Sequence, residues 1–291
     1  MTEGIVTVLK PPAMSSSDVV VDVRKIFETK RVGHLGTLDP EAAGVLPVCV
    51  GRAVRLFDYL VDKQKTYLAE IAFGIATDTQ DAQGKVVETS GAVVTEEQLL
   101  AVLPRFTGTI TQTPPMYSAL KYNGQKLYDL ALAGKEIPDK SREVEIVSLS
   151  CAGTRGKNRF LIEVVCSRGT YIRTLCADIG TALKVPAHMA FLLRTASGPF
   201  TLEHAHSIAE LAEMKEQGRL SDALISCEDA VAFLPRLDLR NDRRKPATNG
   251  LPTRVNAADG TYRLYCGGFL GVGVVQNGNA FLKVHLYGEE A

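Results

Sequence analysis

Apolar residues recur along the chain in two spacings, one typical of strands and one typical of helices. Short apolar runs rich in strand-forming residues predict strands at 5–9, 44–50, 66–75, 143–152, 158–166 and 188–196. Helical spacing predicts helices at 53–61, 95–106, 170–183 and 207–216, and another that starts at residue 18. The predicted fold class is mixed α/β (α+β), with a large and mainly antiparallel sheet.

Two of the predicted helices have recognisable start signals. Ser17 can cap a helix that begins at Asp18, whose carboxylate is favourable near a helix N-terminus. Thr95 can cap the next helix, which has Glu96 and Glu97 in its first turn.

The last sixty residues have a different pattern from the rest. From about residue 233, Gly and Asn turns separate short apolar runs at 262–265, 269–275 and 281–287, which predicts a small β domain. We therefore expect a large domain over residues 1–230 and a small one over 231–291. The stretch 107–142 of the large domain is less regular.

Composition identifies an ordinary globular protein. The chain has 291 residues, 45% of them apolar, and a mean hydropathy of +0.03, which is enough for a substantial core. We find no apolar run near the roughly 20 residues that span a bilayer. The N-terminus shows no secretory signal, so a cytoplasmic protein with no membrane association is expected.

The six cysteines form no CxxC pair, and several lie in strand-like apolar runs. They are expected to be buried, reduced thiols rather than disulfides or zinc ligands. His204 and His206 could face one side of a strand, but no partner cluster is nearby, so no metal is expected.

The net charge is zero, but the charges are segregated along the chain. Residues 150–200 hold seven basic and two acidic side chains, residues 201–230 two basic and seven acidic, and residues 231–254 six basic and two acidic. A basic, nucleic-acid-binding face can therefore exist on a neutral protein, although unrelated solvated faces would give the same counts.

The most distinctive stretch is the loop from Gly33 to Pro40, which carries one carboxylate, Asp39, ahead of an apolar segment. Gly33 and Gly36 permit backbone angles and close approaches that other residues forbid. Pro40 favours an extended Asp39 and removes a backbone donor. Asp before Pro is also an ordinary turn signal, and the loop alone leaves both interpretations open.

Five blocks, in order, resemble the TruB family of tRNA pseudouridine synthases, which modify position 55 in the T loop. They are residues 4–6 with 10–16, the loop 33–47, Lys65 to Tyr67, Pro115 to Tyr122, and Ser167 to Arg173. The resemblance covers about residues 4–200 well and the remainder loosely. It implies the pseudouridine synthase fold with a PUA-like C-terminal β domain.

The resemblance also implies roles for single residues. Asp39 matches the family's catalytic aspartate, and Arg173 matches the arginine that pairs with it. Tyr67 matches a tyrosine that stacks on the target base. Tyr171 and Leu192 match residues that line the uracil pocket.

Further matches concern contact with the RNA. His34 matches a histidine that fills the space left by the flipped nucleotide, and Lys10 is expected to support the active-site strand or bind backbone phosphates. Residues 107–142 correspond to the family's RNA-gripping insertion, in which Lys121, Tyr122 and Lys126 are expected RNA contacts. Arg243 and Arg244 are expected RNA contacts in the tail. One departure is Leu193, where the family often has an arginine before the residue matching Arg194.

Converting uridine to pseudouridine needs no redox cofactor and no nucleotide donor, and the chain has neither a GxxxxGK[ST] loop nor a GxGxxG fingerprint. No cofactor is therefore expected. The expected partner is tRNA, bound at its T loop and acceptor stem by a monomer. Two alternatives stay open at this point: a non-catalytic tRNA-binding or tRNA-folding protein of the same fold, and a hydrolase that uses His34 with Asp39.

Overall fold

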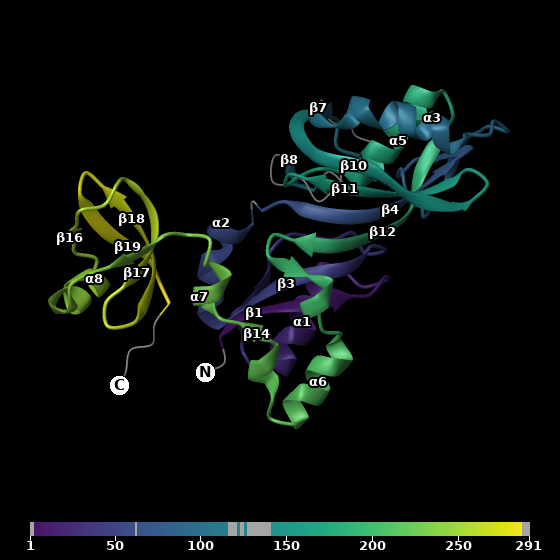
Figure 1. Cartoon of the computed structure of the whole chain (residues 1–291). Coiled ribbons are helices and arrows are strands. Elements are labelled where there is room, and N and C mark those ends of the chain that lie inside the picture. The colour runs from purple at the N-terminus through teal and green to yellow at the C-terminus, as the bar shows by residue number, and fades with distance from the viewer. Residues whose placement is uncertain (1–2, 62, 116–120, 123–124, 127–140, 287–291) are drawn as a thin grey trace.

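The computed structural model describes residues 3–61, 63–115, 121–122, 125–126 and 141–286, and it has one large and one small sheet (Figure 1). The large sheet confirms the predicted mixed α/β class. Its order is β14 (Leu224–Ile225), β1 (Gly4–Lys10), β3 (Ala43–Val50), β12 (Ala187–Ser197), β4 (Lys65–Phe73), β11 (Arg159–Cys166), β10 (Arg142–Gly156) and β7 (Gly108–Gln112), with β2 (Val32–His34) on β3 and β13 (Phe200–Thr201) on β12.

Among the described strand pairs of this sheet, only β3 and β12 run parallel. Their register sets Ala43 against Leu193 and Gly44 against Arg194. This parallel contact lies in the middle of the sheet and brings the segment after Asp39 against β12. Two short hairpins, β5 (Ile75–Thr77) with β6 (Val86–Thr89) and β8 (Lys121–Tyr122) with β9 (Gln125–Lys126), lie outside the large sheet.

Most of the described helices pack against the large sheet, and the last one lies in the small domain (Figure 1). The described helices are α1 (Ser16–Ile26), α2 (Phe57–Leu60), α3 (Glu96–Val102), α5 (Ile172–Leu183), α6 (Ile208–Glu216), α7 (Cys227–Ala230) and α8 (Arg244–Thr248), with short 3₁₀ turns at Gly51–Leu56, Leu103–Phe106, Leu202–His204, Leu220–Ala223 and Asn241–Arg243. Figure 1 shows α1 and α6 near β1 and β14, whereas α3 and α5 lie near β7 and β10. The main apolar core lies between the large sheet and the helices α1, α3, α5 and α6.

Local details differ from the sequence prediction at helix starts. α1 is capped by Ser15, not Ser17, because the Asp18 carboxylate reaches back to the Ser15 backbone and completes a capping box. Thr95 caps α3 as predicted, with Gln98 as its capping-box partner. The helix predicted at 95–106 changes to a 3₁₀ turn at Leu103, and the one at 53–61 begins as a 3₁₀ turn.

The tail forms the predicted small β domain. Its sheet has the order β15 (Arg236–Asp238), β17 (Gly260–Tyr265), β18 (Phe269–Gln276), β19 (Asn279–His285) and β16 (Thr253–Arg254). Val272, Val284 and Leu286 belong to an apolar cluster that also contains Leu35 and Leu56 of the large domain. The small domain is thus attached through a shared core beside α2 and α7 (Figure 1).

All six cysteines are free thiols, and four of them are buried. Burial raises the pKa of the Cys49 thiol to about 12 and that of Cys166 to about 11, which makes both unreactive. Among the described residues, no group of three or more His, Cys, Asp or Glu side chains could hold a metal ion. No described helix is long and apolar enough to cross a membrane.

Candidate active site

A cavity of about 440 Å³ opens beside the start of α5 and the central strands β4 and β12. Its wall includes six side chains predicted from the sequence: His34, Asp39, Tyr67, Tyr171, Arg173 and Leu192. These residues come from four separate segments of the chain, so only the folded sheet brings them together.

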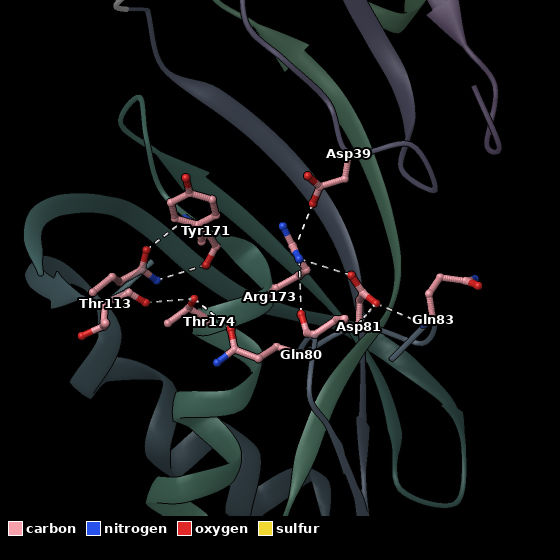
Figure 2. A network of polar contacts seen from close by, with 10 residues as sticks. Asp39, Gln80, Asp81, Gln83, Thr113, Tyr171, Arg173 and Thr174 are labelled. Carbon is pink, nitrogen blue, oxygen red and sulfur yellow. Dashed lines mark hydrogen bonds and ion pairs between the residues drawn. The ribbon is translucent and has the colours of Figure 1, made fainter. Parts of the chain in front are cut away.

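Asp39 and Arg173 form the charged centre of the cavity (Figure 2). Nε of Arg173 lies 3.0 Å from Oδ2 of Asp39, and Nη1 lies 3.4 Å from Oδ2 of Asp81. Nη1 also donates to the carbonyl of Thr79 at 3.3 Å. The Arg173 side chain is 6% exposed, whereas that of Asp39 is 40% exposed. The carboxylate can therefore reach a ligand while its partner cation is fixed.

The position of Arg173 has an electrostatic cost that its partners offset. It lies in the first turn of α5, where the helix dipole disfavours a cation. Two carboxylates and a carbonyl surround the guanidinium, and Asp81 is itself held by hydrogen bonds from the Thr79 hydroxyl and the Gln83 backbone. Asp81 was not predicted from the sequence, since it lies in an ordinary polar turn.

Lys10 is not among the residues that line the cavity. Its side chain is 0% exposed, and Nζ donates to the carbonyls of Pro11, Met14 and Pro40 at 2.7, 2.7 and 2.8 Å. Burial lowers its pKa to about 8, although Glu41 and Asp39 oppose that shift. Lys10 thus supports the loop just after Asp39 and has no donor left for a phosphate.

Arg194 holds the other side of the same loop. Its side chain, 1% exposed, donates from Nε to the Val45 carbonyl at 2.7 Å and from the two Nη atoms to Gly36 and Thr37 at 3.3 and 3.4 Å. Gly44 permits the close approach of the β3 backbone to the backbone of Arg194. Its φ is +111°, and a Cβ there would lie 2.2 Å from the Arg194 carbonyl oxygen.

This role of Arg194 was not predicted from the sequence. A signal was present, since Arg194 follows Leu192 at strand spacing and so shares its buried face. The backbone of Gly36 has a φ of +113°, a conformation that favours glycine. Gly33 differs, because a Cβ there would meet no atom within 4 Å. The loop is also held by Ser16, whose hydroxyl bonds both the N–H and the carbonyl of Leu38.

Tyr67 and Leu192 supply the apolar and aromatic part of the wall from the paired strands β4 and β12. Burial raises the pKa of the Tyr67 phenol, and the nearby Arg194 guanidinium opposes that shift. His34 lies on β2, where burial first and Arg194 second lower its pKa and favour a neutral ring. Its Nδ1 has no hydrogen-bond partner in the described part of the chain.

Two other predicted RNA contacts, Arg243 and Arg244, do not line this cavity. In the small domain, Arg243 donates to the Pro252 carbonyl at 2.9 Å and Arg244 to the Cys266 carbonyl at 2.6 Å, so both guanidiniums help to hold that fold. The backbones of Lys121, Tyr122 and Lys126 lie in β8 and β9, but their side chains, like most of the 107–142 insertion, lie outside the described residues.

Comparison with known families agrees with this site. Residues 24–172 match the family model for the N-terminal domain of TruB family pseudouridylate synthases, and residues 173–232 match that for the C-terminal domain of tRNA pseudouridylate synthase B. The tRNA pseudouridine synthase B of Bacillus pumilus is 44% identical over 256 residues, which are 86% of this chain and 83% of that protein. The tRNA pseudouridine synthase B of Caldanaerobacter subterraneus subsp. tengcongensis is 42% identical over 280 residues, which are 94% of this chain and 95% of that protein.

Solved structures share the fold. A chain in the crystal structure of a Cbf5-Nop10-Gar1 complex has a TM-score of 0.72 and 26% identity, covering 97% of this chain and 80% of that one. A chain in the structure of an H/ACA RNP bound to a substrate RNA containing 2'-deoxyuridine has a TM-score of 0.76 at 23% identity, with 99% and 86% covered. The fold is that of a pseudouridine synthase. Within that class, the chain belongs to the TruB family.

Proposed function

We propose that this chain converts uridine to pseudouridine at position 55 in the T loop of tRNA, with Asp39 as the nucleophile. The observation that carries the proposal is the pairing of the half-exposed Asp39 carboxylate with the buried Arg173 guanidinium, 3.0 Å apart at the cavity wall. The guanidinium supplies a fixed positive charge beside the carboxylate when a bound base excludes water.

The reaction breaks the bond from ribose to N1 of the base and forms a bond from ribose to C5 of the same base. Asp39 assists either by covalent attack or by stabilising a cationic sugar. The target base must first leave its stack in the folded loop. Tyr67 then stacks on the base and Leu192 and Tyr171 enclose it, because all three line the same cavity.

We extend the proposal to the partner and to the domains. The substrate tRNA is bound by a monomer in the cytoplasm, with the T loop at the cavity and the acceptor stem at the small domain. The catalytic domain comprises residues 1–230 and the RNA-binding domain residues 231–291. This division is supported by the end of α7 at Ala230 and by the basic residues of 231–254.

Release of tritium from C5-labelled uridine tests the reaction, since only bond formation at C5 displaces that hydrogen. An unmodified tRNA transcript should release one equivalent of tritium per tRNA. A transcript with cytidine in place of uridine 55 should release none while it still binds. Equal release from both transcripts would contradict the assignment to position 55, and no release from either would contradict the reaction.

A further inference from the structure

The turn that joins β11 to α5, residues 167–171, is held by side chains other than the six predicted residues of the cavity wall. The turn brings Tyr171 to the cavity wall and leads into the helical turn that carries Arg173. Tyr171 is the N-cap residue of α5, yet its own side chain makes no capping bond. The position of the turn therefore depends on what packs against it.

Gln112, the last residue of β7, packs against the end of this turn. Its side chain is 0% exposed, which is unusual for glutamine. Nε2 donates to the Tyr171 carbonyl at 3.1 Å, and Oε1 accepts from the Tyr171 N–H at 2.9 Å. One side-chain amide thus bonds both backbone groups of Tyr171, whose carbonyl also accepts from the Leu175 N–H at 3.1 Å in the first turn of α5.

Arg142 lies directly opposite Gln112 in the register of β7 and β10, and it holds the middle of the turn. Its Nη2 donates to the Gly169 carbonyl, and its Cζ lies 5.0 Å from the centroid of the Tyr171 ring. Gly169 has a φ of +86°, and a Cβ there would lie 3.1 Å from the Arg142 Cζ. The close approach therefore needs glycine at this position.

The start of the turn is tied to the same edge of the sheet. Ser167 donates its N–H to the Glu145 carbonyl at 2.9 Å and accepts the Glu145 N–H on its hydroxyl at 2.9 Å. The ends of β7 and β10 are themselves joined by a 2.7 Å hydrogen bond between the hydroxyls of Thr113 and Ser141. The edge formed by β7 and β10 thus holds the turn at its start, middle and end.

We propose that Gln112 and Arg142 are positioning residues for the reaction: they fix the 167–171 turn so that Tyr171 faces the cavity and Arg173 meets Asp39. The inference rests on the proposed function. Gln112 acts through the backbone of Tyr171. Arg142 acts through the Gly169 carbonyl and the Tyr171 ring, and it also lines the cavity. A displacement of about 1 Å at reacting groups costs on the order of 100-fold in rate, so a loosened turn slows the chemistry.

Three variants of β7 separate this role from general support of the fold. Gln112→Met removes both hydrogen bonds to Tyr171, whereas Gln112→Glu keeps the acceptor and, because burial favours its protonated form, can still donate to the carbonyl. Thr111→Val is the matched control, because Thr111 is exposed on the same strand and pairs with Glu143. Each variant is measured by single-turnover tritium release with saturating enzyme, by tRNA affinity, and by hydrogen exchange of the peptide that covers 167–176.

Gln112→Met should lower the single-turnover rate about 10- to 100-fold, in line with that positional sensitivity, leave tRNA affinity within about threefold, and speed exchange in 167–176. Gln112→Glu should lie between it and the control, and it carries the test if Gln112→Met does not fold. Unchanged exchange would overturn the hold on the turn. Faster exchange at an unchanged rate would overturn its catalytic consequence. Wild-type protein that releases no tritium would instead contradict the proposed function, before any variant is compared.

Discussion

Replacing Arg194 with methionine should damage the active site more than the fold. The substitution removes three hydrogen bonds from a side chain that is 1% exposed. The bond to Val45 at 2.7 Å is buried and charged, and contributes about 1.5–3 kcal/mol. The longer bonds to Gly36 and Thr37 border the cavity, where water can replace them, so each adds about 0.5–1 kcal/mol.

We therefore expect a loss of about 3–5 kcal/mol in the free energy of unfolding, within the 5–15 kcal/mol typical of folded proteins. The variant should stay folded at low temperature, and its loop should be free to shift. Because Gly36 and Thr37 precede Asp39 by only a few residues, we expect a single-turnover rate about 100-fold lower. Arg194→Lys keeps the charge and one donor, so it should recover part of both losses.

Urea unfolding and single-turnover tritium release measure the two effects on the same preparation. The matched control is Arg159→Met, which removes an exposed arginine of β11 paired with Glu70 and should cost at most about 1 kcal/mol. The reasoning would be refuted by an Arg194→Met protein that is destabilised as expected but isomerises at the wild-type rate. In that case Arg194 supports the sheet and not the loop.

Three other predictions follow from the site and the domain contact. Tyr67→Phe should bind tRNA normally and react much more slowly, whereas Tyr67→Leu should also lose stacking worth about 1–3 kcal/mol; a wild-type rate for the phenylalanine variant would exclude a role for the hydroxyl. Lys10 has a pKa of about 8 when folded but about 10.4 when unfolded, so the unfolded chain binds more protons between those values. The stability of wild type relative to Lys10→Met should thus rise by up to about 1.4 kcal/mol per pH unit from pH 8 to 10, and a flat difference would contradict that pKa. Removing residues 233–291 should lower the melting temperature, because Val272 and Leu286 leave the shared apolar cluster; an unchanged melting temperature would show that the domains are independent. The same truncation should lower the salt dependence of tRNA binding, because it removes the basic residues of the tail.

Much of this architecture could be predicted because it depends on local patterns. Alternating apolar residues in β4 and β12 and the Gly/Asn turns of the tail act over a few residues, and the predicted elements agree with the structure to within a few positions. The cap of α1 was misplaced because three consecutive serines can all serve as caps. Only the capping-box reach of Asp18 selects Ser15.

The supporting residues of the site could not be predicted in the same way. Each supporting residue acts on a partner that is distant in the sequence. Gln112 lies 59 residues from Tyr171, Asp81 lies 92 residues from Arg173, and Arg194 lies 158 residues from Gly36. Their partners are known only once the sheet has formed. The tail likewise appeared separable by its charge and turn pattern, whereas Val284 and Leu286 share a cluster with Leu35 of the catalytic loop.

The central claim is that the Asp39 carboxylate performs the chemistry and contributes little to affinity. Asp39→Asn tests it most directly, since the amide preserves the shape of the side chain and removes the charge that faces Arg173. We predict no tritium release from C5-labelled tRNA under single-turnover conditions, with tRNA affinity within about tenfold of wild type, or roughly 1.4 kcal/mol. Measurable turnover by the purified variant, free of contaminating wild-type enzyme, would contradict the claim.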